Sequence, residues 1–314
     1  MLSRTADHLY WMARYTERAE NLARLLDVTY RMSLLYGGMG ANDPGWAAAL
    51  AIMGTESGYR TKYGEVSSTG VMTYMGFDKE NPSSIFRCLQ SARENAHAVR
   101  GTLTSELWET LNDTWLKLRD TSPSVMTSSE AGPFLEWVKF RSHLSRGVTL
   151  GTMLQDEALW FARLGTYLER ADSTARILDV QATRLLGSET PVDMAGDYYQ
   201  WSALLRTISA FEVYRRVYHD RITPLRVAEL VILREDMPRS LHKCLNEVTE
   251  ILSRVSNRSS GETERRAGLL HATLHFGQVE EIFKQGLHEF LVHFVGRVAK
   301  LSDRIAHDFL IPQH

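Results

Sequence analysis

Apolar and small side chains recur every three or four positions through most of this chain, which is the spacing of one helix face. The first run predicts a helix from about residue 7 to residue 36. Few stretches alternate apolar and polar residues with the period of two that half-buried strands require. The pattern therefore predicts an all-α protein, a helical bundle with little or no sheet. The inward stripe of the first helix consists of Leu9, Met12, Thr16, Ala19, Ala23, Leu26, Tyr30 and Ser33.

Glycine, serine, threonine and proline cluster where we expect the helices to end. Residues 54–70 are rich in Gly, Ser and Thr and predict a polar loop, and residues 121–133 predict a linker between helices. Asn81-Pro82-Ser83 predicts a helix start, because proline fits the first turn of a helix. Further breaks are expected at Gly37-Gly38 and at residues 187–196, 223–224, 237–238 and 257–261.

Two segments that lie about 152 positions apart have nearly the same sequence. Residues 15–28 read YTERAENLARLLDV and residues 167–180 read YLERADSTARILDV, so nine of the fourteen positions are identical. A second match aligns residues 82–89 with residues 238–245 and pairs the two cysteines, Cys88 and Cys244. The period is too long for a solenoid repeat. We therefore predict a tandem duplication, with repeats at about 1–150 and about 151–314, folded as two globular halves with pseudo-two-fold symmetry.

Composition and charge argue against several classes of function. The 314 residues carry 36 basic and 38 acidic side chains, a formal net charge of −2, which gives no electrostatic footprint for nucleic acid. No apolar run approaches the length of about 18 residues that a membrane-spanning helix needs, and the first residues lack a hydrophobic leader. We therefore expect a cytoplasmic protein with no nucleic-acid and no membrane partner. Both cysteines are expected to be buried and structural.

The repeated helix carries charges in a fixed arrangement. On a helical wheel, the first copy gathers its acids and bases on one polar face, opposite its apolar side. Arg18 and Arg170 instead fall at the rim of the apolar side, where an arginine needs a carboxylate partner. We therefore expect a central polar network or ligand-binding site, the Glu–Arg centre, made of Glu17, Arg18, Glu20 and Arg24 with Glu169, Arg170, Asp172 and Arg176.

Three interpretations of the Glu–Arg centre follow from these residues. The first is a structural network that fixes how two halves dock. The second is a polar pocket for a zwitterionic or carboxylate ligand, in which arginine binds a carboxylate and the acids hold an amine. The third is a carboxylate-bridged metal site, but no histidine follows either glutamate at the three-residue spacing of such sites in helical bundles.

Two further groups of residues are candidates for chemistry. His271 and His275 are four residues apart, a spacing that can hold a metal ion, but the sequence shows no third ligand. The sequence also contains no phosphate-binding glycine loop and no nucleophile elbow. From the residues we therefore expect no metal and no cofactor. Six polar residues predict either pocket lining or hydrogen bonds between helices: Arg93, Glu94, Asn95, Glu106, Glu109 and Asn112.

Several of these motifs resemble one known family, the bacterial alpha-E domain family. The resemblance rests on the two Glu-Arg helices, on Asn81-Pro82-Ser-Ser-Ile, and on residues 92–96, 106–112, 200–205 and 238–240. It covers essentially all of residues 1–314 as one alpha-E domain and implies an all-helical fold with a repeated Glu-Arg motif, here Glu17-Arg18 and Glu169-Arg170. Members typically occur beside, or fused to, a circularly permuted ATP-grasp ligase-like protein, often with a transglutaminase-like protease. His97 departs from the pattern, which leads us to expect arginine there.

The resemblance and the lack of catalytic motifs lead to one expected function and two alternatives. We expect a non-catalytic helical partner of an ATP-grasp-type amide or peptide ligase system, which binds or positions a peptide or amino-acid substrate. The first alternative is an enzyme that acts on a peptide or amide at the Glu–Arg centre, with the glutamates as general acid and base. The second is a purely structural scaffold.

Overall fold

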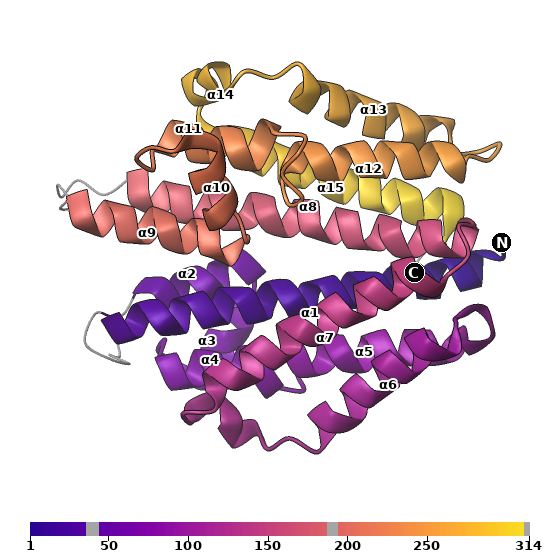
Figure 1. Ribbon diagram of the computed structural model, residues 1–314, viewed down its shortest axis with the longest axis horizontal. Coiled ribbons are helices and arrows are strands. Elements are labelled where there is room, and N and C mark those ends of the chain that lie inside the picture. The colour runs from indigo at the N-terminus through magenta and orange to yellow at the C-terminus, as the bar shows by residue number, and fades with distance from the viewer. Residues whose placement is uncertain (36–43, 187–193, 311–314) are drawn as a thin grey trace. The chain divides into compact units, whose positions relative to one another are not determined.

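A computed structural model describes residues 1–35, 44–186 and 194–310 of the chain. Within these ranges the chain forms fifteen α-helices, with a few short 3-10 or π turns and no strand (Figure 1). The all-α fold that the periodicity predicts is therefore confirmed. None of the helices in these ranges combines the length and the apolarity that a membrane-spanning helix requires. The predicted break at residues 37–38 and residues 187–193 of the predicted break at 187–196 lie outside the described residues. The end of that predicted break is wrong, because residues 194–196 belong to a helix, Met194–Thr207.

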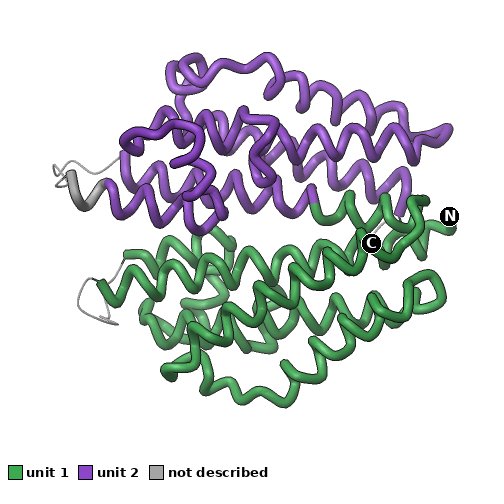
Figure 2. The backbone as a smooth tube through the Cα atoms, viewed as in Figure 1, with its two compact units in different colours: residues 1–166 green, residues 167–314 purple. Residues whose placement is uncertain are grey.

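The chain divides into two compact units, Met1–Thr166 and Tyr167–His314, called unit 1 and unit 2 below (Figure 2). The division falls inside one long helix, α8 (Glu157–Leu186), which carries the second copy of the repeated sequence. The sequence places the boundary between repeats earlier, at about residue 150. The duplication and its symmetry stay predictions, and each unit is described by itself.

Unit 1 is built around α1 (Ser3–Leu35), which packs against α5 (Ile85–Ala98) and α7 (Ala131–Thr152) (Figure 1). The helix α6 (Ser105–Arg119) lies between α5 and α7 in the chain and contacts both. Leu9, Ala19 and Leu26 of α1 are fully buried, as the 3-4 spacing predicts. The remaining elements of this unit are α2 (Pro44–Met53), α3 (Glu56–Tyr63), α4 (Ser68–Phe77), η1 (Arg100–Thr102) and η2 (Pro123–Thr127).

The predicted polar loop at residues 54–70 is wrong, because this segment contains α3 and the start of α4. A buried tyrosine, Tyr59, holds the two helices together. Its hydroxyl donates to the carbonyl oxygen of Glu65 and accepts the backbone N–H of Ser67, the N-cap of α4. The predicted linker at 121–133 is too long for a similar reason. It contains η2, and Pro133 lies in the first turn of α7, where a missing N–H costs little.

Unit 2 contains the rest of α8 and a series of shorter helices that end in a long one. α12 (Leu241–Arg254) and α13 (Gly261–His275) form a helical hairpin, and α13 also packs against α15 (Leu287–Phe309) (Figure 1). The turn between α12 and α13 agrees with the break predicted at 257–261. The other elements are α9 (Met194–Thr207), α10 (Phe211–Tyr218), α11 (Pro224–Ala228), the π-helical turn η3 (Glu229–Leu233) and α14 (Val279–Gln285).

Aligned segments of the two units have the same local structure. Ser84 and Ser240 cap α5 and α12, and each hydroxyl also donates to the carbonyl oxygen six residues earlier. Cys88 and Cys244 follow on these helices as buried free thiols, as expected. Tyr214 of unit 2 is bound as Tyr59 is in unit 1, because its hydroxyl donates to a loop carbonyl and accepts the N–H of the N-cap of α11. These likenesses are local, and the duplication itself stays a prediction.

Candidate functional site

The polar face of α1 is buried against α7. Glu17, Glu20 and Asp27 are nearly inaccessible to solvent, at 1%, 0% and 5% exposure. An isolated carboxylate so deeply buried costs several kcal/mol, and a charged partner must offset that cost. The partners come from the facing helix, where the basic side chains of α7 reach across to α1.

Arg146 of α7 is the central partner. Its Nη1 donates to Glu17 Oε2 at 2.7 Å and its Nη2 donates to Glu20 Oε2 at 2.8 Å, so that one guanidinium joins two acids one turn apart. Arg24 binds the other oxygen of Glu20, with its Nε 3.0 Å from Oε1. The ring of His143 lies within hydrogen-bond distance of both arginines, at 2.9 Å from Arg24 and 2.8 Å from Arg146.

A second group of charges lies at the other end of the same contact. Lys139 of α7 is buried, and its Nζ donates to Asp27 Oδ2 at 2.9 Å and to Glu136 at 2.6 Å. Arg31 donates to the other oxygen of Asp27 at 2.8 Å. Glu17, Glu20 and Asp27 of α1 thus all accept hydrogen bonds from basic side chains of α7. Their arrangement fits a structural network within unit 1.

Sequence reasoning found the acids of α1 but missed their partners on α7. These are Lys139, His143 and Arg146, which are four and three residues apart and therefore lie on one helix face. That spacing is the signal that could have found them. Arg18, which we expected to need a carboxylate, has its guanidinium carbon 5.7 Å from the centre of the Tyr15 ring.

The second copy of the Glu-Arg helix lies in unit 2, where Glu169 and Arg170 are both buried. Arg170 donates to the backbone carbonyl oxygen of Pro238 at 3.4 Å and stacks over Tyr167. One turn further, Arg176 binds Asp172 at 2.8 Å in the predicted pairing of residues four apart. The structure thus places these residues on α8 as the wheel predicts; that they form one centre with those of α1 stays a prediction.

The six polar residues that we considered as pocket lining lie on α5 and α6. Arg93 donates to the side-chain oxygen of Asn112 at 3.2 Å, which is a hydrogen bond between these helices. Its guanidinium also stacks on Trp108, with 5.3 Å between its carbon and the ring centre. Asn95 is hydrogen-bonded to the His8 ring at 2.8 Å. The remaining three residues, Glu94, Glu106 and Glu109, are exposed.

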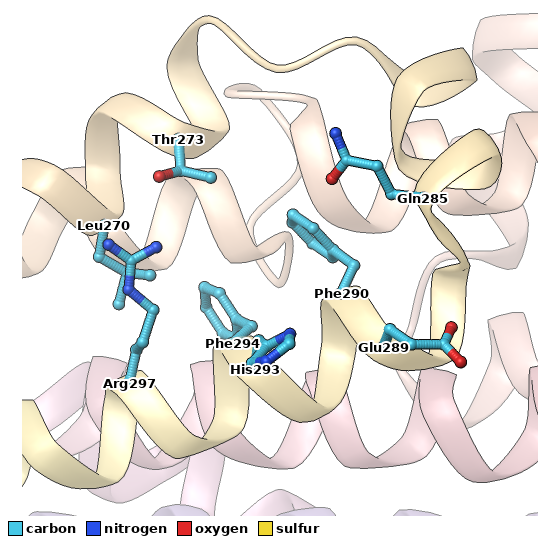
Figure 3. Close-up of a pocket in the computed structure, with 8 residues that line it drawn as sticks. All are labelled: Leu270, Thr273, Gln285, Glu289, Phe290, His293, Phe294 and Arg297. Carbon is cyan, nitrogen blue, oxygen red and sulfur yellow. The ribbon is translucent and has the colours of Figure 1, made fainter.

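Unit 2 contains an open cleft of about 660 Å3, which sequence reasoning did not find. It lies between α13, α14 and α15, and Figure 3 shows Phe290 and Phe294 projecting from α15 toward the other two helices. Leu270 of α13 is buried and adds to the apolar surface. The volume is within the range of small-molecule sites, about 300–1,000 Å3. Polar residues complete the lining: Thr273, Gln285, Glu289, His293 and Arg297.

Opposite charges stand at the two ends of this cleft. Arg297 lies beside Leu270 at one end, and Glu289 lies at the other end in the first turn of α15 (Figure 3). The two residues are eight positions apart on one helix, which corresponds to about 12 Å along its axis. Gly286 precedes this helix with a φ of +99°, and a Cβ there would meet the Glu289 carboxylate. Glycine at this position therefore allows the carboxylate to lie close to the backbone.

Comparison with known proteins agrees with the fold and with the motif. The alpha-E family, described as a predicted alpha-helical domain with a conserved ER motif, matches residues 1–310. Uncharacterised proteins of Mycobacterium bovis and Mycobacterium tuberculosis are each 25% identical to this chain over 321 aligned positions. The alignments cover 96% of this chain and 36% of each relative, so the chain spans about a third of the length of the curated relatives it matches. No solved structure gives a significant match. This chain belongs to the alpha-E family.

Proposed function

We propose that this protein is a non-catalytic helical partner of an ATP-grasp-type amide or peptide ligase, and that it binds or positions a short peptide substrate. The association with a circularly permuted ATP-grasp protein, and with a transglutaminase-like protease, is what the family resemblance implies. In the mycobacterial relatives, the region that matches this chain is only about a third of a longer polypeptide. In those relatives the helical domain is therefore joined to further sequence, which is compatible with a domain that works together with another protein or domain.

The Glu–Arg helix of unit 1 supports a role without catalysis. A general acid or base must reach the proton that it transfers, within about 3 Å or through one water molecule. Glu17 and Glu20 are almost fully buried, and Arg146 binds both of them. A guanidinium that binds a carboxylate also favours its charged form, which has no proton to donate and takes one up only weakly.

The observation that carries the peptide-binding proposal is the charged cleft of unit 2. Its floor is aromatic, and its ends carry Glu289 and Arg297 about 12 Å apart along α15. An extended chain spans about 3.3–3.6 Å per residue, so a peptide of about three residues brings its two termini to these ends. Arginine binds a terminal carboxylate through two parallel hydrogen bonds, and a glutamate attracts a terminal ammonium group.

Titration calorimetry with the full chain tests this ligand directly. We expect the tripeptide Ala-Phe-Ala to bind with one site per chain, and its N-acetylated, C-amidated form to bind at least about tenfold more weakly, because it lacks both charges. Arg297→Ala should weaken binding of the free peptide to a similar extent. Arg266→Ala is the matched control, since Arg266 is exposed on α13 outside the cleft and pairs with Glu262. Equal affinity for the free and the blocked peptide, or no binding of either, would overturn the proposal.

The partner role has a separate test. The protein should co-purify with the ATP-grasp ligase encoded beside it, and should change the rate at which that ligase joins its substrates. An enzyme acting at the Glu–Arg centre predicts instead that the chain alone turns over a peptide or amide and that Glu17→Gln and Glu169→Gln abolish the turnover. A pure scaffold predicts that Glu17→Gln lowers only the melting temperature and leaves the activity of the ligase unchanged.

A further inference from the structure

Three histidines of unit 2 come together between the helices of the α12–α13 hairpin. His242 is the second residue of α12, and His271 and His275 lie one turn apart at the end of α13. Each of the three offers one ring nitrogen, and these three nitrogens all lie within 4.8 Å of one another. The sequence shows the pair on α13, and the structure supplies the third member from a different helix.

The orientation of His242 is fixed by a hydrogen bond. Its Nδ1 lies 2.8 Å from the carbonyl oxygen of Leu233, the last residue of the π-helical turn η3. Because a carbonyl oxygen only accepts, Nδ1 carries the proton, and Nε2 of the neutral ring keeps its lone pair. A backbone carbonyl that holds the second nitrogen in this way is the usual support of a metal-binding histidine.

The Nε2 atom of His242 is buried and has no hydrogen-bond partner among the described residues. A buried polar atom without a hydrogen-bond partner lowers the stability of a fold, so the lone pair of Nε2 is a candidate ligand for a bound ion. The rings of His271 and His275 are the nearest aromatic neighbours, with ring centres 5.3 and 5.4 Å from that of His242. Three imidazoles that lie so close together repel one another if they are protonated. A metal ion bound by the three neutral rings avoids this repulsion and gives the lone pair of His242 Nε2 a partner.

The surroundings of the cluster differ from one ring to the next. Burial lowers the pKa of His271, and the two neighbouring histidines lower it further. The carboxylate of Glu235 is close enough to act on His271 with the opposite sign. A nearby negative charge also favours a bound cation. His275 is exposed, so the cluster opens to solvent on one side.

The donor set selects the class of metal. Imidazole nitrogens suit Zn²⁺, Cu²⁺, Ni²⁺ and Co²⁺, whereas Mg²⁺ and Ca²⁺ prefer oxygen ligands. Nitrogens bound at 2.0–2.1 Å to a tetrahedral zinc ion are about 3.3 Å apart. The cluster therefore has to close by somewhat more than 1 Å, a movement within the reach of side-chain rotation at the exposed His275.

We propose that His242, His271 and His275 bind one divalent transition-metal ion of the zinc class, with a fourth coordination position open to solvent. The ion joins the start of α12 to the end of α13 and, through Leu233, to the π-helical turn. Three histidines with an open position are also the ligand set of catalytic zinc sites. The site is independent of the peptide cleft, because His271 and His275 lie on the α12 side of α13 and Leu270 and Thr273 line the cleft.

Metal titration of the full chain tests the proposal. Chain stripped of metal with a chelator should bind one equivalent of Zn²⁺ by calorimetry, and one equivalent of Co²⁺ with the intense visible absorption of four-coordinate cobalt. His275→Ala, which removes an exposed side chain, should weaken zinc binding by at least about a hundredfold while circular dichroism stays unchanged. His271→Ala should do the same.

His307→Ala is the matched control, because this histidine is exposed on α15 outside both the cluster and the cleft. The control should bind zinc with the affinity of the parent chain. His242→Ala removes the third ligand. Because His242 is buried, this substitution can also disturb folding, and the exposed His275→Ala then decides the test. Failure of the stripped chain to bind either metal, or equal zinc affinity for His275→Ala and His307→Ala, would refute the site. A failure here leaves the peptide titration unaffected, because the two sites share no residue.

Discussion

Removal of Arg146 is the most direct test of the buried network in unit 1. In the variant Arg146→Ala, Glu17 and Glu20 lose the guanidinium that they share across the α1–α7 contact. Glu20 keeps its hydrogen bond to Arg24, but the acids remain buried with less positive charge beside them. We therefore expect a large loss of stability from one substitution on a half-buried side chain.

The magnitude follows from the bonds that are lost. Each hydrogen bond to a charged group contributes about 1.5–3 kcal/mol, and two are removed. Water reaches the Arg146 side chain, which is 26% exposed, so the lower part of the summed range applies. A loss of about 3 kcal/mol also agrees with the 3–5 kcal/mol typical of a broken buried ion pair. At about 2–4 °C per kcal/mol, the melting temperature should fall by about 6–12 °C.

Thermal and urea unfolding, followed by circular dichroism, measure this loss. Arg60→Ala is the control: Arg60 forms an exposed ion pair with Glu56 in the same unit, and its removal should cost less than about 1 kcal/mol. Arg146→Lys should fall between the two, because an ammonium group keeps the charge but not the fork that binds two acids. If Arg146→Ala and Arg60→Ala unfold at the same temperature, the α1–α7 charges do not stabilise the fold and the reasoning is refuted.

Three further predictions concern single contacts. Asp179 holds the pKa of His288 above its usual value through a hydrogen bond and its charge, so Asp179→Asn should lower that pKa in an NMR titration. The pair stabilises the fold at low pH, and this stabilisation is lost as the pH rises through the raised pKa. An unchanged pKa of His288 in the variant would contradict the pairing. Tyr59→Phe should destabilise the protein by about 1–3 kcal/mol in urea unfolding, because two backbone groups lose their partner; a neutral effect counts against its role. Gly286→Ala should lower the melting temperature, because Gly286 has a positive φ and a Cβ there would meet Glu289. Gly147→Ala, inside α7 with open space around it, should raise the free energy of unfolding by about 0.5–1 kcal/mol. Two stability changes of the same sign would contradict this reasoning.

Much of the fold could be predicted from the sequence because its signals are local. The 3-4 spacing marks α1. The helix start predicted at Asn81-Pro82 lies a few residues too early, because Ser84 caps α5 and the helix begins at Ile85. The segment 54–70 could not be predicted in this way, since its polar composition is that of a loop. Its helices are held by tertiary contacts, in which the rings of Tyr59 and Tyr63 stack on each other and meet Tyr74 of α4 edge-on. Such contacts override weak helix propensity.

The candidate sites could be predicted only in part, because their members come from helices far apart in the sequence. The wheel of α1 identifies Glu17 and Glu20, but Arg146 lies well over a hundred positions later. His242 could have been anticipated from topology. It precedes the turn between α12 and α13 by about as many residues as His271 follows it, and facing helices of a hairpin bring such positions together. Without the knowledge that these helices are paired, the spacing carries no information.

The two copies of the repeated helix share several charged contacts. Arg24 binds Glu20 and Arg176 binds Asp172, which are aligned pairs four residues apart. Asp27 and Asp179 are aligned in the repeat, and each binds a basic residue of the last complete helix of its own unit, Lys139 in α7 and His288 in α15. In unit 1, Glu17 and Glu20 also bind a residue of α7, Arg146. In unit 2 the last helix instead turns an acidic and a basic side chain toward the cleft with α13 and α14. If the halves descend from one ancestor, these shared contacts are the ones that packing of the repeated helix requires, and the ligand proposed for the cleft would bind residues outside them.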